Sequence, residues 1–305
     1  MKYCFGIDIG GTTVKMGLFD ESGTLLSKWQ IKTRTEHQGE AILPDVANSV
    51  LKKQREFEIA TDDILGIGVG VPAAVCEGGI VENTTNLGWG YKKVKCELQE
   101  LTGYPIYVEN DANLAALGEL EKGAGQGCKD VVMVTLGTGV GGGIIINGRI
   151  VSGVKGGAGE IGEIYVDYEI QEEGARVPKN LEYYASATGI NRLAKKKLAR
   201  NTQKTVLDID NVSAKDVFDA AKMDDVVAIE ILSTFASYLG QALTNLAVTL
   251  APEAFIIGGG VSSAGDILLE YVRQYYHAPN TRLVLAALGN DAGIYGASSL
   301  VLQRT

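Results

Sequence analysis

The chain has few of the residues that build metal centres and redox sites. It contains four cysteines and two histidines in 305 residues, and no two cysteines form a CxxC pair. A tetrahedral zinc site or a dithiol redox motif therefore has little support. We expect the cysteines to be buried or free thiols in a reducing cytoplasm. With so few histidines, acid–base chemistry is expected to depend on carboxylates or water.

Positive charge and long apolar runs are also scarce. The chain has 28 lysines and arginines against 37 acidic residues, which gives a net charge of −9 and a sequence pI of about 4.9. This balance disfavours nucleic acid or an anionic membrane as a general partner. No unbroken apolar run approaches the ~18–20 residues of a membrane span, and no signal-peptide pattern follows Met1. We therefore expect a soluble cytoplasmic protein.

Glycine is the residue in excess, with 39 copies, and it gathers in tight clusters rather than at a fixed period. Two of the clusters belong to an internal repeat. A strand-like segment, a glycine–threonine turn and a second strand-like segment begin near residue 2 and again near residue 131. Such self-similarity predicts two related α/β domains, although two strand–glycine–strand segments also arise by coincidence. We place the first domain at 1–111 plus 290–305 and the second at 112–289.

Three glycine clusters follow predicted strands, at 10–11, 137–143 and 258–260. Consecutive N–H groups in such turns can bind phosphate oxygens, and Thr12, Thr13 and Lys15 add hydroxyls and a charge to the first turn. Three turns favour a nucleotide, although a single Gly-Gly turn often only closes a hairpin. A Walker A loop is absent, and the GxGxxG match at 137–142 is followed by a glycine-rich strand instead of a helix.

Two aspartates stand beside these turns or at a strand end. Asp8 immediately precedes the first turn and could hold Mg²⁺ through water, or be a strand-end carboxylate that is satisfied locally. Asp111, in "VENDAN", lies between an apolar strand and a helical segment. It could cap that helix. As a general base it would take the proton of a substrate hydroxyl that attacks a γ-phosphate.

Four stretches together carry a family resemblance: "FGIDIGGTTVKMGL", "VENDANLAALGE", "VTLGTGVGGGIIINGRIVSGVKGGAGEIGE" and "IIGGGVS". In this order, and over essentially the whole chain, they resemble the ROK family of sugar kinases and related repressors. The resemblance implies two ribonuclease-H-like domains of the actin and hexokinase type around a central cleft. It also implies an ATP-dependent sugar kinase that uses Mg²⁺ and is often a homodimer.

The resemblance assigns roles to individual residues. It implies a first phosphate site formed by Asp8, Gly10, Gly11, Thr12 and Thr13. It implies a second phosphate site at Gly137, Thr138 and Gly139, and an adenosine motif at Gly258, Gly259 and Gly260. It implies sugar contacts from Asn86, Asn110, Glu160 and Glu182, with Asp111 as the catalytic base.

The chain departs from the family pattern at its zinc site. Glu163 replaces the histidine of the family's GEIGH motif, and the three cysteine places of the zinc motif hold Glu173, Ala175 and Asn180. Without thiolates or histidine we predict no structural zinc. Residues 168–182 must then be held in another way. Glu163 remains a candidate sugar contact, with a solvated or locally paired carboxylate as the alternative.

We therefore expect a kinase that transfers the γ-phosphate of ATP to O6 of a hexose, with glucose as the default. Loss of the histidine leaves a β-glucoside such as cellobiose, or N-acetylmannosamine, as alternative substrates. A non-catalytic sugar sensor is less favoured because Asp8 and Asp111 are both present. A DNA-binding repressor would need an N-terminal domain for which this chain has no room, and an actin-like filament protein has no evident use for the Asn110, Asp111 and Glu160 pattern.

Overall fold

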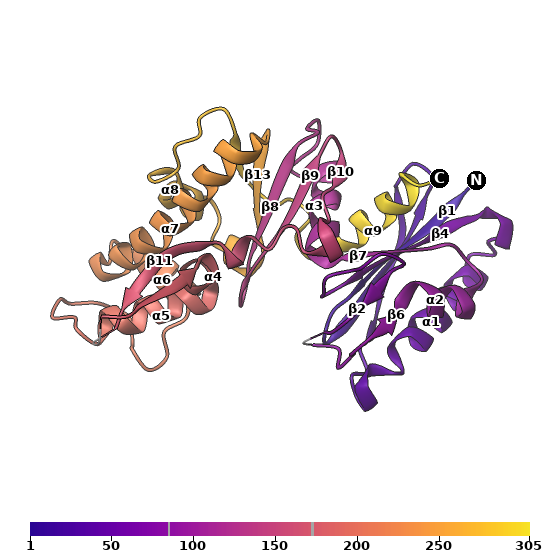
Figure 1. Cartoon of the computed structure of the whole chain (residues 1–305), viewed down its shortest axis with the longest axis horizontal. Coiled ribbons are helices and arrows are strands. Elements are labelled where there is room, and N and C mark those ends of the chain that lie inside the picture. The colour runs from indigo at the N-terminus through magenta and orange to yellow at the C-terminus, as the bar shows by residue number, and fades with distance from the viewer. Residues whose placement is uncertain (85, 172–173) are drawn as a thin grey trace. The chain divides into compact units, whose positions relative to one another are not determined.

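The computed structural model describes residues 1–84, 86–171 and 174–305, and these form two compact units (Figure 1). The first unit contains Met1–Lys129, Gly143–Gly159 and Ala287–Thr305, and the second contains Asp130–Gly142 and Glu160–Ala286. Each unit has strands with helices packed on them. In each, a strand, a glycine turn and a second strand begin the unit, so the predicted repeat is confirmed at the level of its elements.

A five-stranded sheet in the order β3-β2-β1-β4-β7 forms the centre of the first unit. Its strands are β1 (Tyr3–Ile9), β2 (Thr13–Asp20), β3 (Leu25–Lys32), β4 (Ile64–Val71) and β7 (Ile106–Asn110). The first three form an antiparallel meander, and β4 and β7 run parallel to β1. The carboxyl ends of β1, β4 and β7 therefore meet at one edge, where open α/β sheets bind ligands.

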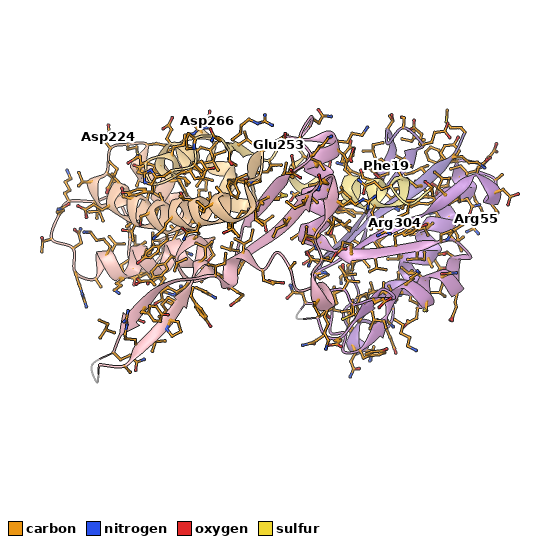
Figure 2. All side chains as sticks on the ribbon, turned by 45° about the horizontal axis from the view of Figure 1, so that its top comes forward. Phe19, Arg55, Asp224, Glu253, Asp266 and Arg304 are labelled. Carbon is orange, nitrogen blue, oxygen red and sulfur yellow. The ribbon has the colours of Figure 1, made fainter. Side chains whose placement is uncertain are left out.

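Helices cover both faces of this sheet. They are α1 (Ile42–Glu56), α2 (Val94–Thr102), α3 (Asp111–Lys122) and α9 (Ala292–Leu302). The short strands of this unit are β5 (Ile80–Val81), β6 (Lys92–Lys93) and β10 (Arg149–Ile150). Its short helices are η1 (His37–Gly39), η2 (Thr61–Asp63), η3 (Val154–Gly156) and η6 (Gly289–Asp291). On one face lies Phe19 of β2, which is labelled in Figure 2. It packs with Cys4, Ile294 and Val301. Burial raises the pKa of the Cys4 thiol to about 12, and all four cysteines are free thiols, as predicted.

Helices α3 and α9 pack so closely that the first unit extends beyond its predicted limits. A Cβ on Gly118 or on Gly296 would collide with the backbone of the facing helix, at Ala292 and Leu114 respectively. Glycine therefore permits the approach. This packing places residues 112–129 with the first unit, whereas the sequence assigned 112–289 to the second domain.

The second unit contains three parallel strands, with β13 (Ala254–Gly258) between β8 (Val131–Leu136) and β14 (Arg282–Leu285). Strand β9 (Val140–Ile146) begins in this unit and ends in the first. The remaining elements are the hairpin β11 (Tyr165–Ile170) and β12 (Arg176–Asn180), the helices α4 (Leu181–Ala185), α5 (Ala187–Leu198), α6 (Ala214–Ala221), α7 (Val226–Leu250) and α8 (Asp266–Arg273), and the short helices η4 (Ile161–Glu163) and η5 (Gly260–Ala264).

Helix α7 is long and apolar enough to cross a membrane by length and composition alone, although polar residues interrupt its apolar sequence. It is the one such helix among the described residues, and more than half of its apolar window is buried. Phe235, Leu239 and Leu243 are fully buried within the second unit. This burial is what the core helix of a globular unit shows, so α7 by itself is weak evidence for a membrane span.

Candidate functional site

The first glycine turn joins β1 to β2 and is fixed by its own backbone. Gly10 N–H donates to Thr13 O at 3.1 Å, Thr33 N–H donates to Thr12 O at 3.0 Å, and the Thr33 hydroxyl donates to Gly10 O at 2.6 Å. Gly11 and Thr12 are exposed at the tip of the turn. The predicted first phosphate loop is thus an ordered surface turn that presents backbone and hydroxyl groups to solvent.

Asp8 lies near the end of β1, opposite Lys15 of β2 in the strand register. The Lys15 Nζ atom lies 3.8 Å from Asp8 Oδ2 and donates to Asn290 O at 3.0 Å. Burial raises the pKa of Asp8, and the charge of Lys15 acts in the opposite direction. A largely buried carboxylate with one long ion pair is a hard oxygen donor that fits Mg²⁺ held through water.

Asn86 lies directly against this turn. A Cβ built on Gly11 would lie 3.1 Å from the Asn86 Cβ atom, so the absence of a side chain at Gly11 makes this approach possible. The Asn86 side chain is exposed. The structure therefore brings a predicted sugar contact next to the predicted phosphate loop within the first unit.

Asn110 and Asp111 stand where β7 passes into α3. The N-cap is Asn110, whose Oδ1 accepts from Ala112 N–H at 2.9 Å and Asn113 N–H at 3.1 Å, while its Nδ2 donates to Ala73 O at 3.3 Å. The capping role that the sequence left open for Asp111 therefore belongs to its neighbour. Asp111 is the first helical residue, and its Oδ1 accepts from Ala112 N–H at 2.8 Å.

Asp8 and Asp111 lie on either side of β4 at the carboxyl edge of the parallel strands. Gly70 of β4 pairs with Asp8 of β1 and with Glu109 of β7. A Cβ on Gly70 would lie 3.5 Å from Ile7 O and 3.7 Å from Asp111 Cα. Two carboxylates, the glycine turn and Asn86 therefore belong to one edge of one unit.

Glu109 is hydrogen-bonded to the residues that begin α3 at this sheet edge. No role was assigned to it from the sequence. Its Oε1 accepts from Asn110 N–H at 2.9 Å and from Asn113 Nδ2 at 3.1 Å, and its Oε2 accepts from the Ser152 hydroxyl at 3.0 Å. A carboxylate with three donors holds the start of α3 in place. Its position within "VENDAN" was the available signal.

The second glycine turn, in the second unit, is bound to α4 and α5. Gly137 N–H donates to Gly139 O at 2.9 Å, Gly137 O accepts from Ala187 N–H at 2.8 Å, and Thr138 O accepts from the Thr188 hydroxyl at 2.8 Å. Glu182 of α4 accepts from Val140 N–H at 2.9 Å and lies against Gly139, where a Cβ would collide with its carboxylate. The structure thus joins Glu182, a predicted sugar contact, to the second phosphate turn.

The third glycine cluster follows β13. Gly259 has φ of 82°, and a Cβ there would lie 2.5 Å from Leu136 O, so only glycine fits. A cavity of about 470 Å³ lies beside this cluster and the second turn. Its walls include Gly137, Thr138, Phe218, Val261 and Gly260, together with Ala187, Ala214, Lys215, Asp219, Lys222, Ser263 and Ala264. Two of the three predicted nucleotide motifs therefore share one cavity, and the contribution of α6 to it had no sequence signal.

Glu160 and Glu163, three residues apart in the sequence, have different environments. Glu160 is exposed and precedes η4. Glu163 Oε2 accepts from Asn180 Nδ2 at 3.1 Å, and Asn180 Oδ1 caps α4 by accepting from Tyr183 N–H at 3.0 Å. The residues at the family's histidine place and at one of its cysteine places are thus hydrogen-bonded to each other. Glu173, at another cysteine place, lies outside the described residues.

A second cluster holds the β11–β12 hairpin. Asp167 Oδ2 accepts from the Tyr184 hydroxyl at 2.9 Å and from the Tyr238 hydroxyl at 2.6 Å, and the two rings stack at 3.7 Å. These bonds connect β11 to α4 and α7. Hydrogen bonding from Tyr238 lowers the pKa of Asp167, whereas burial and the same carboxylate raise the pKa of Tyr184. Among the described residues, no group of three or more histidine, cysteine, aspartate or glutamate side chains could hold a metal ion.

Comparison with known proteins agrees with this arrangement. The model of the ROK family matches residues 4–304. This chain belongs to the ROK family. A glucokinase of Halalkalibacterium halodurans is 42% identical to this ROK protein over 321 residues, and the match covers 99% of this chain and 96% of that protein.

Solved structures of other ROK proteins give the same result for the fold. A ROK glucokinase of Streptomyces griseus, in complex with glucose and AMPPNP, is 32% identical and matches with a TM-score of 0.74 over 99% of both chains. A ROK hexokinase of Thermus thermophilus is 29% identical, with a TM-score of 0.81 over 99% of this chain and 100% of that chain. The predicted α/β fold with two actin- and hexokinase-type domains is confirmed for this ROK protein.

Proposed function

We propose that this ROK protein is an ATP-dependent glucokinase, which transfers the γ-phosphate of ATP to O6 of glucose. The observation that carries this proposal is the shared sheet edge of the first unit, where a phosphate-type turn, Asp8 and Asp111 occur together. Full-length similarity to a glucokinase supports glucose over a β-glucoside or N-acetylmannosamine.

The cavity beside the second and third glycine clusters is the proposed site for the nucleoside part of ATP. Its volume of about 470 Å³ lies within the usual range for small-molecule sites. Phe218 and Val261 offer apolar contact to a base, and Gly137–Gly139 offer backbone groups to phosphate oxygens. Lys215 and Lys222 provide positive charge at the wall of the cavity.

The first turn is the proposed site for the terminal phosphates, with Gly10, Gly11, Thr12, Thr13 and Lys15 as donors. Asp8 would hold Mg²⁺ through water, and the bound ion would offset phosphate charge during transfer. Buried Asp8 would otherwise repel the phosphates. Lys15 lies close to Asp8, so its positive charge can offset both the Asp8 carboxylate and the phosphates.

Asp111 is the proposed general base. Its carboxylate takes the proton of the glucose O6 hydroxyl while that oxygen forms a bond to the γ-phosphorus. The bond between the γ-phosphorus and the β,γ-bridging oxygen breaks, and its electron pair leaves with ADP. Asn110 and Glu109 fix the first turn of α3, and Asp111 Oδ1 accepts from Ala112 N–H at 2.8 Å, so the carboxylate is oriented by this bond before substrate binds.

The proposed sugar contacts are five polar side chains, namely Asn86, Asn110, Glu160, Glu163 and Glu182. Glu163 and Glu182 each have one oxygen engaged, with Asn180 and Val140 respectively. A carboxylate can accept several hydrogen bonds, so these partners leave capacity for sugar hydroxyls.

We also propose that the protein is a cytoplasmic homodimer that binds neither nucleic acid nor membranes and needs no structural zinc. Its net charge of −9 supports the absence of a polyanionic partner. The bonds that Glu163 and Asp167 make support the absence of zinc, because they hold the segment that a metal would otherwise organise.

The decisive experiment measures ADP release with glucose, mannose, N-acetylglucosamine, N-acetylmannosamine, fructose and cellobiose. We expect the highest kcat/KM with glucose. Nucleotide binding is measured in parallel by calorimetry with a non-hydrolysable ATP analogue. Binding of the analogue without ADP release on any sugar would support a sensor and contradict the proposed reaction.

A further inference from the structure

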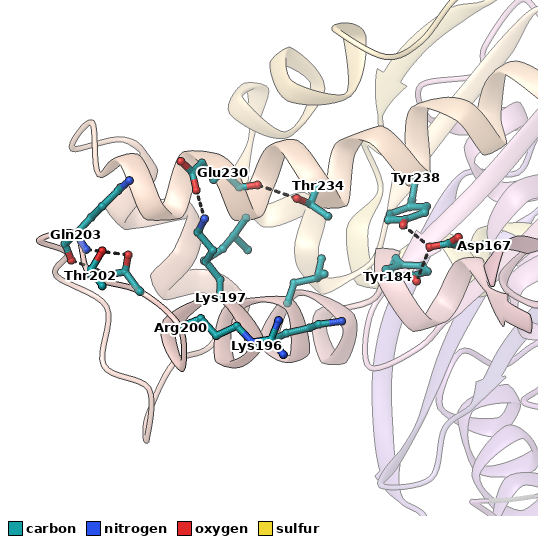
Figure 3. A pocket seen from close by; sticks show the side chains of 13 residues that line it. Asp167, Tyr184, Lys196, Lys197, Arg200, Thr202, Gln203, Glu230, Thr234 and Tyr238 are labelled. Carbon is teal, nitrogen blue, oxygen red and sulfur yellow. Dashed lines mark hydrogen bonds and ion pairs between the residues drawn. The ribbon is translucent and has the colours of Figure 1, made fainter. Parts of the chain in front are cut away.

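A cavity of about 600 Å³ lies between α5 and α7, and none of its lining residues is assigned to ATP or glucose (Figure 3). Its volume is that of a typical small-molecule site. Its lining is mostly polar and charged: Asp167, Tyr184, Leu193, Lys196, Lys197, Arg200, Asn201, Thr202, Gln203, Glu230, Ile231, Thr234 and Tyr238. The proposed reaction uses none of these side chains.

The cavity wall belongs to the most basic segment of an acidic chain. Residues 183–207 contain no aspartate or glutamate and six cations, namely Arg192, Lys195, Lys196, Lys197, Arg200 and Lys204. The whole chain carries 37 acidic residues and only 28 basic ones. Cations in the last turn of α5 also offset its macrodipole. That role needs no cavity, and it does not explain basic residues that continue beyond the helix.

Two of these cations face the cavity with side chains that form no hydrogen bond or ion pair to another described residue. Lys197 forms an ion pair with Glu230 of α7, and Arg192 donates to Tyr183 O at 2.6 Å. Lys196 and Arg200 line the cavity, and neither side chain forms a hydrogen bond or ion pair with another described residue, although the charge of Lys196 acts on Asp167 and lowers its pKa. Lys196 belongs to the last turn of α5, and Arg200 follows the end of that helix at Leu198, so both cations lie at the same end of the cavity wall (Figure 3).

The other end of the cavity has a different chemistry. The stacked rings of Tyr184 and Tyr238 lie there, with an interplanar angle of 12°, and both hydroxyls donate to Asp167 (Figure 3). Aromatic faces suit the C–H faces of a sugar ring, and Asp167 keeps acceptor capacity for hydroxyl groups. Thr234 and Asn201 add polar groups along the wall.

We propose that this cavity is a second binding site, which takes a phosphorylated hexose with its phosphate on Lys196 and Arg200 and its ring toward Tyr184 and Tyr238. A phosphate monoester carries about −1.5 to −2 charge at pH 7, which matches two cations. Recognition of the phosphate rests on the cavity alone. The choice of glucose 6-phosphate rests on the proposed function, because it is the product of that reaction.

The position of the cavity allows a ligand bound there to affect the proposed glucose site. Tyr184 and Glu182 both lie on α4, a helix of five residues. A ligand that contacts Tyr184 therefore contacts the helix that carries a proposed glucose ligand. Glucose 6-phosphate bound here is expected to change the affinity for glucose, so the cavity is a site of product regulation.

Calorimetry with glucose 6-phosphate tests the site directly. The titration uses the full chain with saturating glucose, which keeps the proposed substrate site filled. Inorganic phosphate and glucose 1-phosphate are titrated separately. Two double variants are compared: Lys196→Gln with Arg200→Gln, and, as the matched control, Lys195→Gln with Lys204→Gln, which removes the same charge from residues outside the cavity lining. Circular dichroism verifies that both variants fold.

We expect the first pair to weaken glucose 6-phosphate binding by at least about tenfold, as loss of charge-assisted hydrogen bonds does. The control pair should stay within about twofold, because screened surface charges contribute little. Equal loss in both pairs, no loss in either, or no binding to wild type would overturn the proposal. Stronger binding of inorganic phosphate than of the sugar phosphate would overturn the role of the tyrosines. Failure of the proposed function would show separately, as no glucose binding and no ADP release.

Discussion

Asp111 is the side chain on which the proposed proton transfer depends most directly. Replacement of Asp111 by Asn removes the basic oxygen and keeps the shape, and Asn110 still caps α3. We expect kcat to fall by about 10²–10⁴-fold, the usual contribution of a general base, with little change in KM for ATP. Steady-state ADP release measures this change.

The control for Asp111 is Asp45, an acid in the first turn of α1 in the same unit. Asp45 forms an exposed ion pair with Arg34. The Asp45→Asn variant is expected to keep its activity, because exposed pairs contribute little to stability. A comparable loss of kcat in both variants, or near wild-type activity of Asp111→Asn, would contradict the assignment of the base.

Asp8 gives a prediction in which stability and activity change in opposite directions. Burial raises its pKa above the unfolded value. The folded state therefore binds this proton more tightly, and ionisation of Asp8 costs stability as the pH rises from the unfolded pKa through the folded one. Asp8→Asn should raise Tm relative to wild type once the pH exceeds the folded pKa of Asp8, and should change Tm much less at low pH. Activity should fall by about 10²-fold or more, because charge at the phosphates is no longer organised.

Thermal unfolding of wild type and Asp8→Asn between pH 4 and pH 8, together with ADP release at pH 7.5, tests both halves. A Tm difference that shrinks toward acid pH supports the burial of a charged carboxylate. A variant that is less stable at neutral pH would show instead that Lys15 outweighs the cost of burial.

At the level of elements, the turn after β13 depends on two neighbouring glycines in different ways. Gly259 has φ of 82° and lies against Leu136, whereas a Cβ on Gly260 would meet no heavy atom within 4 Å. We expect Gly259→Ala to destabilise the protein by more than about 1 kcal/mol, because φ is positive and the backbone is in the way. Gly260→Ala should be close to neutral.

Urea unfolding measures the difference between the two alanine variants. Binding of an ATP analogue should weaken in Gly259→Ala, since the turn must shift away from Leu136. Equal stability of the two variants would mean that the turn relaxes without cost, and the close approach to β8 would then have no structural consequence.

The β11–β12 hairpin depends on Asp167, which joins it to α4 and α7. Asp167→Asn replaces one carboxylate oxygen by an NH2 group, so either the two tyrosine hydroxyls or Tyr168 N–H loses its acceptor, and the bonds that remain lose their charge assistance. We expect this change to cost about 1–3 kcal/mol. Because Tyr184 shares α4 with Glu182, we expect KM for glucose to rise by about tenfold with a smaller change in kcat. Kinetics and urea unfolding are compared with Glu169→Gln, whose pair with Lys179 lies on the same hairpin.

The contribution of Asp167 to stability depends on pH, and the direction of this dependence follows from its pKa. Hydrogen bonds lower the pKa of Asp167 below its unfolded value, so its contribution is present above the unfolded pKa and is lost as the pH falls through the folded one. The stability difference between wild type and Asp167→Asn should therefore disappear in acid. A KM for glucose that changes equally in Glu169→Gln would assign the effect to the hairpin surface rather than to Asp167.

At the scale of the whole molecule, the sequence predicts features that depend on neighbouring residues. It does not predict contacts between residues that are far apart in the chain. Strands, glycine turns and the α3 start follow from short patterns, so the fold class and the VENDAN edge were predictable. Asp167 and Tyr238 are 71 residues apart, and no spacing rule joins them. The division of the chain was equally inaccessible, because α3 joins the first unit through glycine contacts with α9, which only the packed structure reveals.

The metal dependence of the whole molecule follows from individual residues and from the β11–β12 hairpin. The segment that a zinc ion would organise is held by Asn180 on Glu163 and by two tyrosines on Asp167, whereas Asp8 is suited to Mg²⁺. Treatment with a chelator should therefore abolish ADP release and leave Tm unchanged, since a structural zinc site contributes folding free energy and a Mg²⁺ held mainly by substrate phosphates does not. Added Mg²⁺ should restore activity, and elemental analysis of the untreated protein should find no stoichiometric zinc. One zinc per chain, or a Tm that falls on chelation, would mean that side chains outside these hydrogen bonds hold a metal, and the account of the hairpin would be wrong.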